Sequence, residues 1–450
     1  MARTALNPFA RLLLAANGAF AGLTVDVEDA ASIKAAAALV AEDLMTFYPG
    51  NNPGQPVGIF TPPPEGKYYW WTGGALWSSL LDYRNRTGET TYDKDISEGL
   101  VFQVGPNDDY LPPNWTASIA NDDQVIWTLA SVAAEEFGLA EPSQDSPQWE
   151  TIARNVFDEL HSDARRVDSG DCEGAIRWQI FAFNNGYNYV NSFSNILYLN
   201  LASQLAYLTG NKTYEDAASD TFKLLEDVGF VNDKYDVFDG AQVTNCKSVN
   251  KAQWSANAAM LLEASAFMYN HTNGDDDWKE RVQGLVSRTL EVFFPNGVAF
   301  ETACEKNNTC TTDIFFFKSF LNRGLSSAIA KAPFTSETIL PVLKSSAKAA
   351  AAQCTGGSNG RLCGFSWSSG KFDNQTGPAQ QMAVLNALAG LLPVEGSVAS
   401  NSTGNSTGSS SGAAQDSSSS GTPAGGAGTQ AVTTGGLMVA FSTLLASLLI

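Results

Sequence analysis

Thr87-Gly88-Glu89-Thr90-Thr91-Tyr92 is a junction that recurs as Thr209-Gly210-Asn211-Lys212-Thr213-Tyr214, with Asn273-Gly274-Asp275-Asp276-Asp277-Trp278 as a degenerate third copy. In each copy the glycine suits a helix end in the left-handed conformation, and a Thr or Asp three residues later suits the cap of a second helix. The pattern therefore predicts a tight turn between two antiparallel helices, used repeatedly. Repeated helical hairpins favour a toroid of paired helices, and a solenoid is the alternative.

Apolar residues recur at the helical period from about residue 25 to Pro393, and no comparable set of alternating strand segments accompanies them. If short strands form, we expect them near residues 237–238 or 297–300. The predicted helices span residues 32–48, 70–86, 122–137, 148–161, 190–208, 214–228, 252–269, 278–293, 313–330, 336–353 and 379–392. We therefore predict an all-α fold.

The charge and the scarcity of histidine exclude several classes of function. A formal net charge of −20 argues against nucleic-acid binding, which rewards clustered Lys and Arg. The only two histidines are His161 and His271, and His271 lies inside a glycosylation sequon. Ser-His-Asp chemistry, Cys-His chemistry and most zinc sites need histidine, so esterase and peptidase functions are disfavoured and carboxylate chemistry remains. We expect no cofactor and no metal.

The cysteines and sequons indicate the secretory pathway. Eight Asn-x-Ser/Thr sequons begin at Asn85, Asn114, Asn211, Asn270, Asn307, Asn374, Asn401 and Asn405. Six cysteines form no Cys-x-x-Cys pair, which favours disulfides over a metal site. Among about 15 pairings that six cysteines allow, proximity favours Cys304–Cys310 and Cys354–Cys363, which leaves Cys172 with Cys246.

The two ends of the chain predict processing signals. Residues 1–21 have the layout of a weak signal peptide, with an apolar run at 12–16 and Ala19-Phe20-Ala21 as the cleavage site. Residues 394–426 read as a Ser/Thr/Gly-rich stalk, and residues 427–450 end in an apolar tail. That layout is typical of a GPI-attachment signal, with a weak tail anchor as the alternative. The folded domain would then span residues 22–393.

Two neighbouring carboxylates in Asn121-Asp122-Asp123-Gln124 stand where a polar loop becomes an apolar helix. Retaining glycosidases need two carboxyl groups about 5 Å apart, which adjacent residues reach easily. The alternative is that one aspartate merely caps the helix. A second triplet, Asn107-Asp108-Asp109, precedes no apolar helix, and we interpret it as a solvated turn.

Loops rich in aromatic and amide side chains would line a central cleft in such a toroid. They are Tyr68-Tyr69-Trp70-Trp71, Trp178-Gln179 and Asn184-Asn185-Gly186-Tyr187-Asn188-Tyr189. Sugars stack their C–H faces on aromatic rings and bond their hydroxyls to amides and carboxylates. The cleft is thus suited to a glycan.

Taken in order, these stretches resemble a known family. Besides the motifs above, the chain contains Arg-Trp-Gln-Ile-Phe (177–181), Tyr-Asp-Val-Phe-Asp-Gly (235–240), Gln-Trp-Ser-x-Asn (253–257) and Ala-Cys-Glu (303–305). Over residues 25–392 the sequence resembles glycoside hydrolase family 76, within it the fungal GPI-anchored mannan endo-1,6-α-mannosidases. The resemblance implies an (α/α)6 barrel and a retaining mechanism on α-1,6-linked mannose.

The resemblance also assigns roles to residues. It implies that Asp122 is the nucleophile, Asp123 the acid/base and Asp239 a contact near the cleaved sugar. We further expect substrate contacts from Asn121, Gln124, Trp70, Trp71, Trp178, Asn188 and Tyr189. Asn121 and Gln124 would hold the aspartate pair by hydrogen bonds.

The expected activity is cleavage of α-1,6-mannosidic bonds in mannan or a GPI-core glycan during cell wall biogenesis. One alternative is transfer of the cleaved glycan to a wall β-glucan acceptor, and another is a non-catalytic lectin-like wall protein. We expect a monomer on the outer face of the cell membrane and in the cell wall, held to the membrane by the GPI anchor alone.

Overall fold

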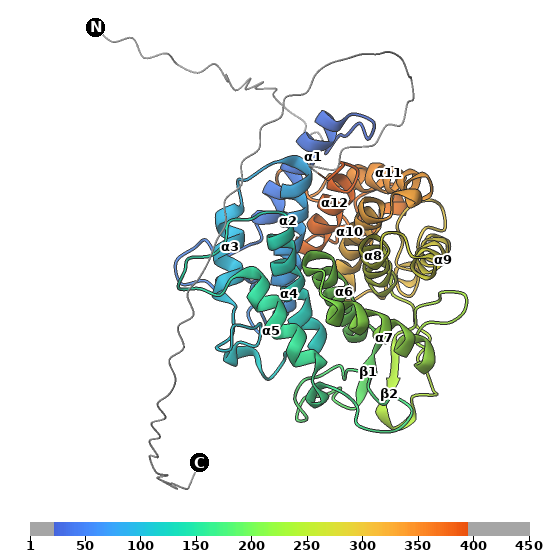
Figure 1. Ribbon diagram of the computed structural model, residues 1–450. Coiled ribbons are helices and arrows are strands. Elements are labelled where there is room, and N and C mark those ends of the chain that lie inside the picture. The colour runs from blue at the N-terminus through green and yellow to red at the C-terminus, as the bar shows by residue number, and fades with distance from the viewer. Residues whose placement is uncertain (1–21, 395–450) are drawn as a thin grey trace, which may run out of the picture. The chain divides into compact units, whose positions relative to one another are not determined.

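The computed structural model describes residues 22–394, so the expected signal peptide, the anchor signal and nearly all of the stalk lie outside the described residues. Within residues 22–394 the helices alternate between an inner and an outer layer (Figure 1). No helix among these residues is both long and apolar enough to cross a lipid bilayer.

Every second helix belongs to an inner ring. Each inner helix packs against the next, and α12 packs back against α2, which closes the ring. Their side chains are buried almost all round, as expected for helices enclosed by others. The inner helices are α2 (Trp71–Thr87), α4 (Asn121–Glu136), α6 (Ser192–Thr209), α8 (Ser255–His271), α10 (Phe317–Lys331) and α12 (Pro378–Ala389). The fold is an (α/α)6 barrel, which confirms the predicted toroid and excludes the solenoid.

The outer helices bury only one face. In α5, for example, Ile152, Val156 and Leu160 are buried at helical spacing while the opposite face is solvated. The outer helices are α1 (Ala30–Met45), α3 (Asp93–Phe102), α5 (Trp149–His161), α7 (Lys212–Val228), α9 (Asp276–Phe293) and α11 (Ser336–Ala352). The junction at residues 87–92 predicts a helix after it, but α3 was missing from the predicted helix spans because its ten residues bury only Ile96, Gly99 and Leu100 and carry too little periodic signal.

The recurring junctions turn as predicted but are capped differently. Gly88 and Gly210 end α2 and α6 with φ of 75° and 68°, in the left-handed conformation. The predicted Thr and Asp caps are wrong. Asn211 caps α7 by accepting from the Thr213 amide at 3.0 Å, and Asp275 caps α9. The next helix starts within one or two residues of the glycine there, so a residue three positions later already lies inside the helix.

Only two short strands are present within residues 22–394. Strand β1 (Tyr189–Asn191) pairs antiparallel with β2 (Gly240–Gln242), with Val190 opposite Ala241. The expectation of strands at 237–238 or 297–300 was misplaced, since Val237 forms only an isolated bridge with Val231. Short 3-10 turns cover Pro113–Trp115, Asp163–Arg165, Val243–Asn245, Glu305–Asn307, Ile314–Phe316, Pro333–Thr335 and Trp367–Ser369.

All three predicted disulfides are confirmed. Cys304 pairs with Cys310 and Cys354 with Cys363, closing short loops, and Cys172 pairs with Cys246 across a sequence separation of 74. Among the described residues no cysteine is left free. Such pairing is typical of proteins that fold in an oxidising compartment.

Candidate active site

A cleft of about 560 Å³ opens where the inner helices begin. Four carboxylates line it, and its lining contains no Lys, Arg or His. Its polar and aromatic lining comprises Tyr69, Trp70, Trp71, Ser118, Asp122, Asp123, Trp178, Gln179, Asn184, Asn185, Asn191, Phe193, Asp239, Trp254, Asn257, Asp313, Phe317 and Phe320. The structure therefore brings together six of the expected site residues: Asp122, Asp123, Asp239, Trp70, Trp71 and Trp178.

Asp122 lies in the first turn of α4 and is 7% exposed. Its Oδ2 accepts a hydrogen bond from Asn191 Nδ2 at 2.8 Å, and its Oδ1 accepts one from the Asp123 amide at 3.0 Å. Burial raises the pKa of Asp122 to about 6, although these hydrogen bonds favour the ionised form. Asp122 is thus a buried carboxylate with donors that stabilise its negative charge.

Asp123 follows directly and faces the same cleft. Its Oδ2 accepts from the Ala120 amide at 2.8 Å, which satisfies a backbone donor just before α4. Burial, followed by the charges of Asp122 and Asp313, raises its pKa well above the usual range. The surroundings of Asp123 therefore favour its protonated form. The capping interpretation describes part of what Asp123 does, while the helix cap itself is Ala120.

Asn121 and Gln124 lie away from the cleft, contrary to our expectation. Both are fully buried and do not line it. Asn121 Oδ1 accepts from Arg165 at 2.8 Å, and Gln124 donates to Glu159 at 2.8 Å. Positions 121 and 124 share one helix face, which points towards the outer layer, whereas 122 and 123 point inward. The two amides fix the start of α4 from behind.

Asp239 is held by three donors. Tyr189 Oη donates to Oδ2 at 2.5 Å, Asn250 Nδ2 donates to the same oxygen at 3.0 Å, and Trp254 Nε1 donates to Oδ1 at 2.8 Å. Tyr189 thus orients Asp239 and does not line the cleft itself. Asn188 is exposed outside the cleft lining, and its carbonyl accepts from the Val243 amide. Because neither Tyr189 nor Asn188 lines the cleft, their positions do not support the substrate contacts that we expected of them.

The tryptophans form rigid walls. Trp70 stacks on Trp127 at 5.0 Å between ring centroids and donates from Nε1 to Gln103 at 2.7 Å. Trp71 packs its edge against Phe316 at 5.0 Å. The Trp178 carbonyl accepts from the Asn121 amide at 2.9 Å, which ties the loop at 178 to the start of α4. Tyr69 is 51% exposed at the cleft.

Asn191 and Asp313 line the cleft but were not singled out in the sequence analysis, and Trp254 appeared there only within the Gln-Trp-Ser-x-Asn motif. Asp313 Oδ1 is buried without a hydrogen-bond partner among the described residues, and burial raises the pKa of this carboxyl. Asn191 and Trp254 directly precede α6 and α8, and Asp313 lies four residues before α10. A polar or aromatic residue at the start of a nearly all-apolar helix was the signal that could have found them.

The other candidate catalytic residues of the sequence, Asp109 and His161, have structural roles. Asp108 occupies an exposed turn at φ 55°, but Asp109 is fully buried and its Oδ1 accepts from the Leu111 amide at 2.9 Å. The interpretation of 107–109 as a solvated turn is therefore wrong for Asp109. His161 bonds Tyr198 Oη at 2.7 Å and stacks on Phe157. Asp108, Asp109 and His161 are all absent from the cleft lining.

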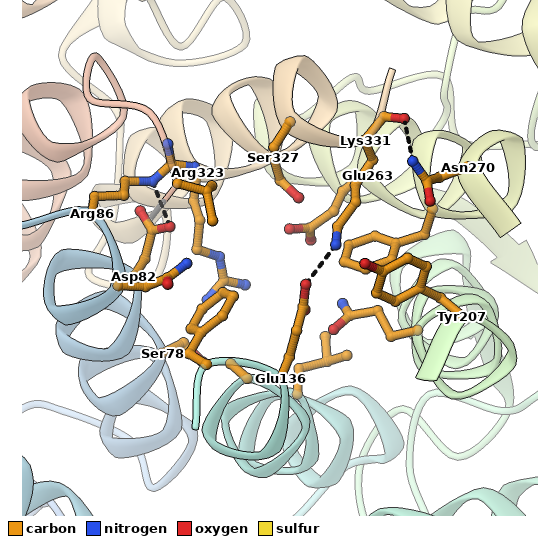
Figure 2. Close-up of a pocket in the computed structure, with 18 residues that line it drawn as sticks. Ser78, Asp82, Arg86, Glu136, Tyr207, Glu263, Asn270, Arg323, Ser327 and Lys331 are labelled. Carbon is orange, nitrogen blue, oxygen red and sulfur yellow. Dashed lines mark hydrogen bonds and ion pairs between the residues drawn. The ribbon is translucent and has the colours of Figure 1, made fainter. Parts of the chain in front are cut away.

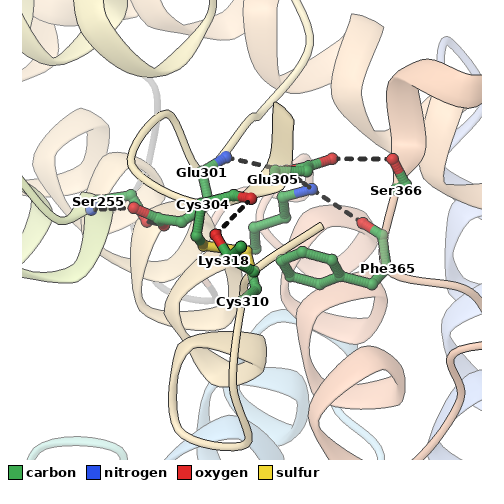
Figure 3. The surroundings of a disulfide bond; sticks show 9 residues. Ser255, Glu301, Cys304, Glu305, Cys310, Lys318, Phe365 and Ser366 are labelled. Atoms are coloured by element: carbon green, nitrogen blue, oxygen red, sulfur yellow. Dashed lines mark hydrogen bonds and ion pairs between the residues drawn. A yellow bond between two sulfur atoms is a disulfide. The ribbon is translucent and has the colours of Figure 1, made fainter. Parts of the chain in front are cut away.

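A buried network, in which the Glu301 amide donates to Glu305 at 2.9 Å, joins the starts of α8 and α10 (Figure 3). Glu301 accepts from the Ser255 amide at 3.1 Å and from Ser255 Oγ at 2.5 Å. Lys318, fully buried on α10, pairs with Glu305 at 2.8 Å and donates to the Phe365 carbonyl at 2.8 Å. Burial raises the pKa of Glu301 to about 7. The Cys304–Cys310 disulfide closes the loop that carries Glu305.

The family model for glycosyl hydrolase family 76 matches residues 32–402. The chain belongs to this family. It is a glycosidase of family 76, and curated relatives lie in its fungal branch. It is 39% identical to mannan endo-1,6-alpha-mannosidase DCW1 of Candida glabrata, over 85% of this chain and 86% of the relative. It is 37% identical to mannan endo-1,6-alpha-mannosidase DFG5 of Saccharomyces cerevisiae, over 82% and 80%.

Solved structures of the family share the barrel. Dfg5 from Chaetomium thermophilum, crystallised with glucosamine, superposes with a TM-score of 0.79 at 42% identity, covering 81% of this chain and 91% of the other. An inactive variant of an alpha-1,6-mannanase from Salegentibacter, with two neighbouring aspartates changed to asparagine, was solved with alpha-1,6-mannotriose. It superposes with a TM-score of 0.62 at 16% identity, over 80% of this chain and 98% of the other.

Proposed function

We propose that this family 76 glycosidase cleaves α-1,6-mannosidic bonds by a retaining mechanism, with Asp122 as nucleophile and Asp123 as acid/base. The observation that carries the proposal is the pair itself. Two adjacent carboxylates face one cleft from the first turn of α4, and only Asp122 has side-chain amide support for its charge. Fungal relatives named mannan endo-1,6-alpha-mannosidases support the linkage.

In the first step Asp122 Oδ attacks the anomeric carbon as the glycosidic C–O bond breaks. Asp123 donates its proton to the departing oxygen, and a covalent mannosyl-enzyme ester forms. In the second step the Asp123 carboxylate takes a proton from an incoming hydroxyl, whose oxygen attacks the same carbon. The ester bond breaks and Asp122 is released as a carboxylate. Two inversions leave the configuration of the sugar unchanged.

The environment of each aspartate suits its role. A nucleophile must be ionised, and the Asn191 donor favours the carboxylate of Asp122. An acid must hold its proton near the working pH, and burial beside two other carboxylates raises the pKa of Asp123. The walls formed by Trp70 and Trp71 would exclude water and stack on sugar rings.

The charge of the cleft favours a particular kind of glycan. Four carboxylates face the cleft without any cationic side chain, which favours a substrate that carries a positive charge. An amino sugar supplies one, and the Chaetomium relative was solved with glucosamine. We therefore propose a GPI-core glycan, which contains mannose beside an amino sugar, as a substrate alongside α-1,6-mannan.

A second candidate activity is transfer of the mannosyl group to another glycan. The rings of Phe181 and Phe183 stack at 5.3 Å, and Phe183 is 73% exposed. They lie on the loop whose Trp178 and Asn184 line the cleft, so they offer an apolar surface beside it. Such a surface suits an acceptor such as β-glucan, whose hydroxyl would replace water in the second step. We place this activity in the cell wall, with the enzyme GPI-anchored to the membrane.

Incubation with an α-1,6-mannan oligosaccharide, with and without a β-glucan oligosaccharide, tests these proposals. We expect mass analysis to find shorter mannosides, and a mannosyl-glucan product if transfer occurs. Proton NMR during the reaction should show the α-anomer of the new reducing end first. An initial β-anomer would contradict a retaining mechanism.

Asp122→Asn and Asp123→Asn should each abolish turnover while the fold is kept. Asp108→Asn is the matched control, because it changes an aspartate in a similar Asn-Asp-Asp triplet on an exposed turn. A lectin-like protein would bind the oligosaccharide equally well in all four proteins and cleave it in none.

A further inference from the structure

A second cavity lies at the opposite end of the barrel, among the closing turns of the inner helices (Figure 2). We call it the lower cavity. Its volume is about 340 Å³, which is within the range of about 300–1,000 Å³ typical of small-molecule sites. Asn270 lines it and is also exposed on the surface, so the space reaches solvent. The mechanism proposed above uses none of its residues.

The lining of the lower cavity is charged but balanced. It contains three acids, Asp82, Glu136 and Glu263, and three bases, Arg86, Arg323 and Lys331. Four of these side chains form two ion pairs. Arg86 Nε lies 2.7 Å from an Asp82 oxygen, and Lys331 Nζ lies 2.5 Å from a Glu136 oxygen. Arg86 also donates to the Leu392 carbonyl and to Ser326. These four side chains have their charges matched within the protein.

Arg323 and Glu263 have no partner of opposite charge among the described residues. Within residues 22–394 neither forms an ion pair. Arg323 lies over the Phe320 ring and approaches only the Met260 sulfur at 3.9 Å, and its Nε is buried with no acceptor. Glu263 is 5% exposed and accepts only a neutral donor, Asn200 Nδ2, at 3.0 Å. In Figure 2 both extend into the cavity, from α10 and α8.

A charge without a partner is costly to bury, and this cavity holds a buried carboxylate, Glu263, and a half-buried guanidinium, Arg323, whose Nε is buried without an acceptor. A carboxylate or phosphate binds a guanidinium with two parallel hydrogen bonds, and an ammonium suits a buried carboxylate. One molecule that carries both groups would match Arg323 and Glu263 together while leaving the cavity neutral. We propose that the lower cavity binds a small zwitterion, with its acidic group on Arg323 and its ammonium on Glu263. This proposal is independent of the activity assigned to the cleft.

Titration calorimetry and thermal unfolding with defined probes test the proposal. The probes are glycine, β-alanine, γ-aminobutyrate and phosphoethanolamine, which span a range of separations between the two charges. The full chain is used after enzymatic removal of N-linked glycans, because Asn270 begins a sequon at the surface end of the cavity. We expect at least one zwitterion to bind and to raise the unfolding midpoint. Acetate, methylammonium and glycerol, each at the same concentration, should not.

Variants locate the binding. Arg323→Gln and Glu263→Gln keep the size of the side chains and remove one charge each, and each should weaken binding at least tenfold. Ala133→Phe should abolish binding by filling the cavity. Asp123→Asn in the cleft and Arg154→Gln on the exposed face of α5 are controls that should bind normally. Circular dichroism identifies any variant that fails to fold, and the remaining variants carry the test.

Three results would overturn the proposal. The first is that no zwitterion raises the unfolding midpoint of the parent protein, which would make the cavity a water-filled space. The second is an equal effect of glycerol, or of acetate with methylammonium. The third is binding that is lost in Asp123→Asn but kept in Arg323→Gln and Glu263→Gln, which would place the zwitterion in the cleft.

Discussion

Asn191 donates from Nδ2 to Asp122 Oδ2 at 2.8 Å, and its own Oδ1 caps α6 by accepting from the Ser194 amide at 3.2 Å. One side chain therefore joins the starts of two neighbouring inner helices and supports a buried carboxylate. The pKa of Asp122 is raised to about 6 by burial even with this donor present. The balance between burial and hydrogen bonding at Asp122 is thus set by a residue 69 positions away in sequence.

Asn191→Ser should move the acid limb of the pH–activity profile upward. Serine keeps a good helix cap but is too short to reach Asp122, so the pKa of Asp122 rises above about 6. The loss of a hydrogen bond to a charged group, about 1.5–3 kcal/mol, predicts a fall in kcat/KM of roughly 10- to 150-fold at neutral pH. Initial rates between pH 4 and 9 measure this, and Asn51→Ser on an exposed turn is the control. An unmoved acid limb would show that Asn191 does not set the ionisation of Asp122.

Asp313→Asn should move the opposite limb of the profile downward. Burial and the charge of Asp122 contribute most to the raised pKa of Asp123, and the charge of Asp313 adds to it. Without that charge Asp123 loses its proton at lower pH, so the loss of activity on the alkaline side of the profile begins at a lower pH. The same rate measurements test this, with Asp108→Asn as the matched control. A basic limb that stays in place would separate Asp313 from the proton donor.

Asp123→Asn should stabilise the protein at neutral pH but not in acid. A carboxyl whose pKa is raised on folding favours the folded state below its unfolded pKa of about 3.9, and that advantage is lost as pH rises through the folded pKa. Asparagine does not ionise, and its amide oxygen can still accept from the Ala120 amide. The unfolding midpoint of the variant should therefore exceed that of the parent at pH 7, and the difference should shrink at pH 4. Equal differences at both values would contradict the raised pKa.

Lys318→Met should destabilise the fold strongly, because it leaves Glu305 buried without its partner (Figure 3). Breaking one side of a buried ion pair costs about 3–5 kcal/mol. Adding Glu305→Gln to Lys318→Met removes the unmatched charge and should recover part of that loss. Urea unfolding of both single variants and the double variant measures the coupling. The exposed pair Lys94 and Glu98 provides a control cycle, with an expected coupling below about 1 kcal/mol. Additive effects at 318 and 305 would exclude the proposed coupling.

The sequence was sufficient for most helices and for the disulfides. Helices of the inner ring have apolar residues on almost every face and stand out as long apolar segments, whereas long outer helices such as α5 have a strong apolar stripe and stand out by periodicity. Helix α3 was missed because a short helix with three buried residues leaves little periodic signal. The caps of α7 and α9 were misplaced because several Thr, Asn and Asp residues stand near each glycine, and only the backbone decides which one precedes the first turn.

The site was predicted less completely than the fold. Asp122 and Asp123 could be found because they are adjacent in the chain and stand at the start of a helix. Asn121 and Gln124 flank them in sequence but point the other way, because successive positions on a helix face different directions. Asp239 was expected from the resemblance, but its three donors come from two other segments and its own loop.

By itself, the chain's pattern of apolar residues and glycine turns determined a series of helical hairpins with a carboxylate pair at one helix start, and the contact of α12 with α2 in the structure decided that the hairpins close into a ring. Only the tertiary structure decided which polar groups share a space: Asn191 with Asp122, Asp313 near Asp123, and Arg323 in one cavity with Glu263. The physical reason is that helix formation depends on residues three and four positions apart, whereas charge and hydrogen bonding in a closed ring depend on residues that meet across it.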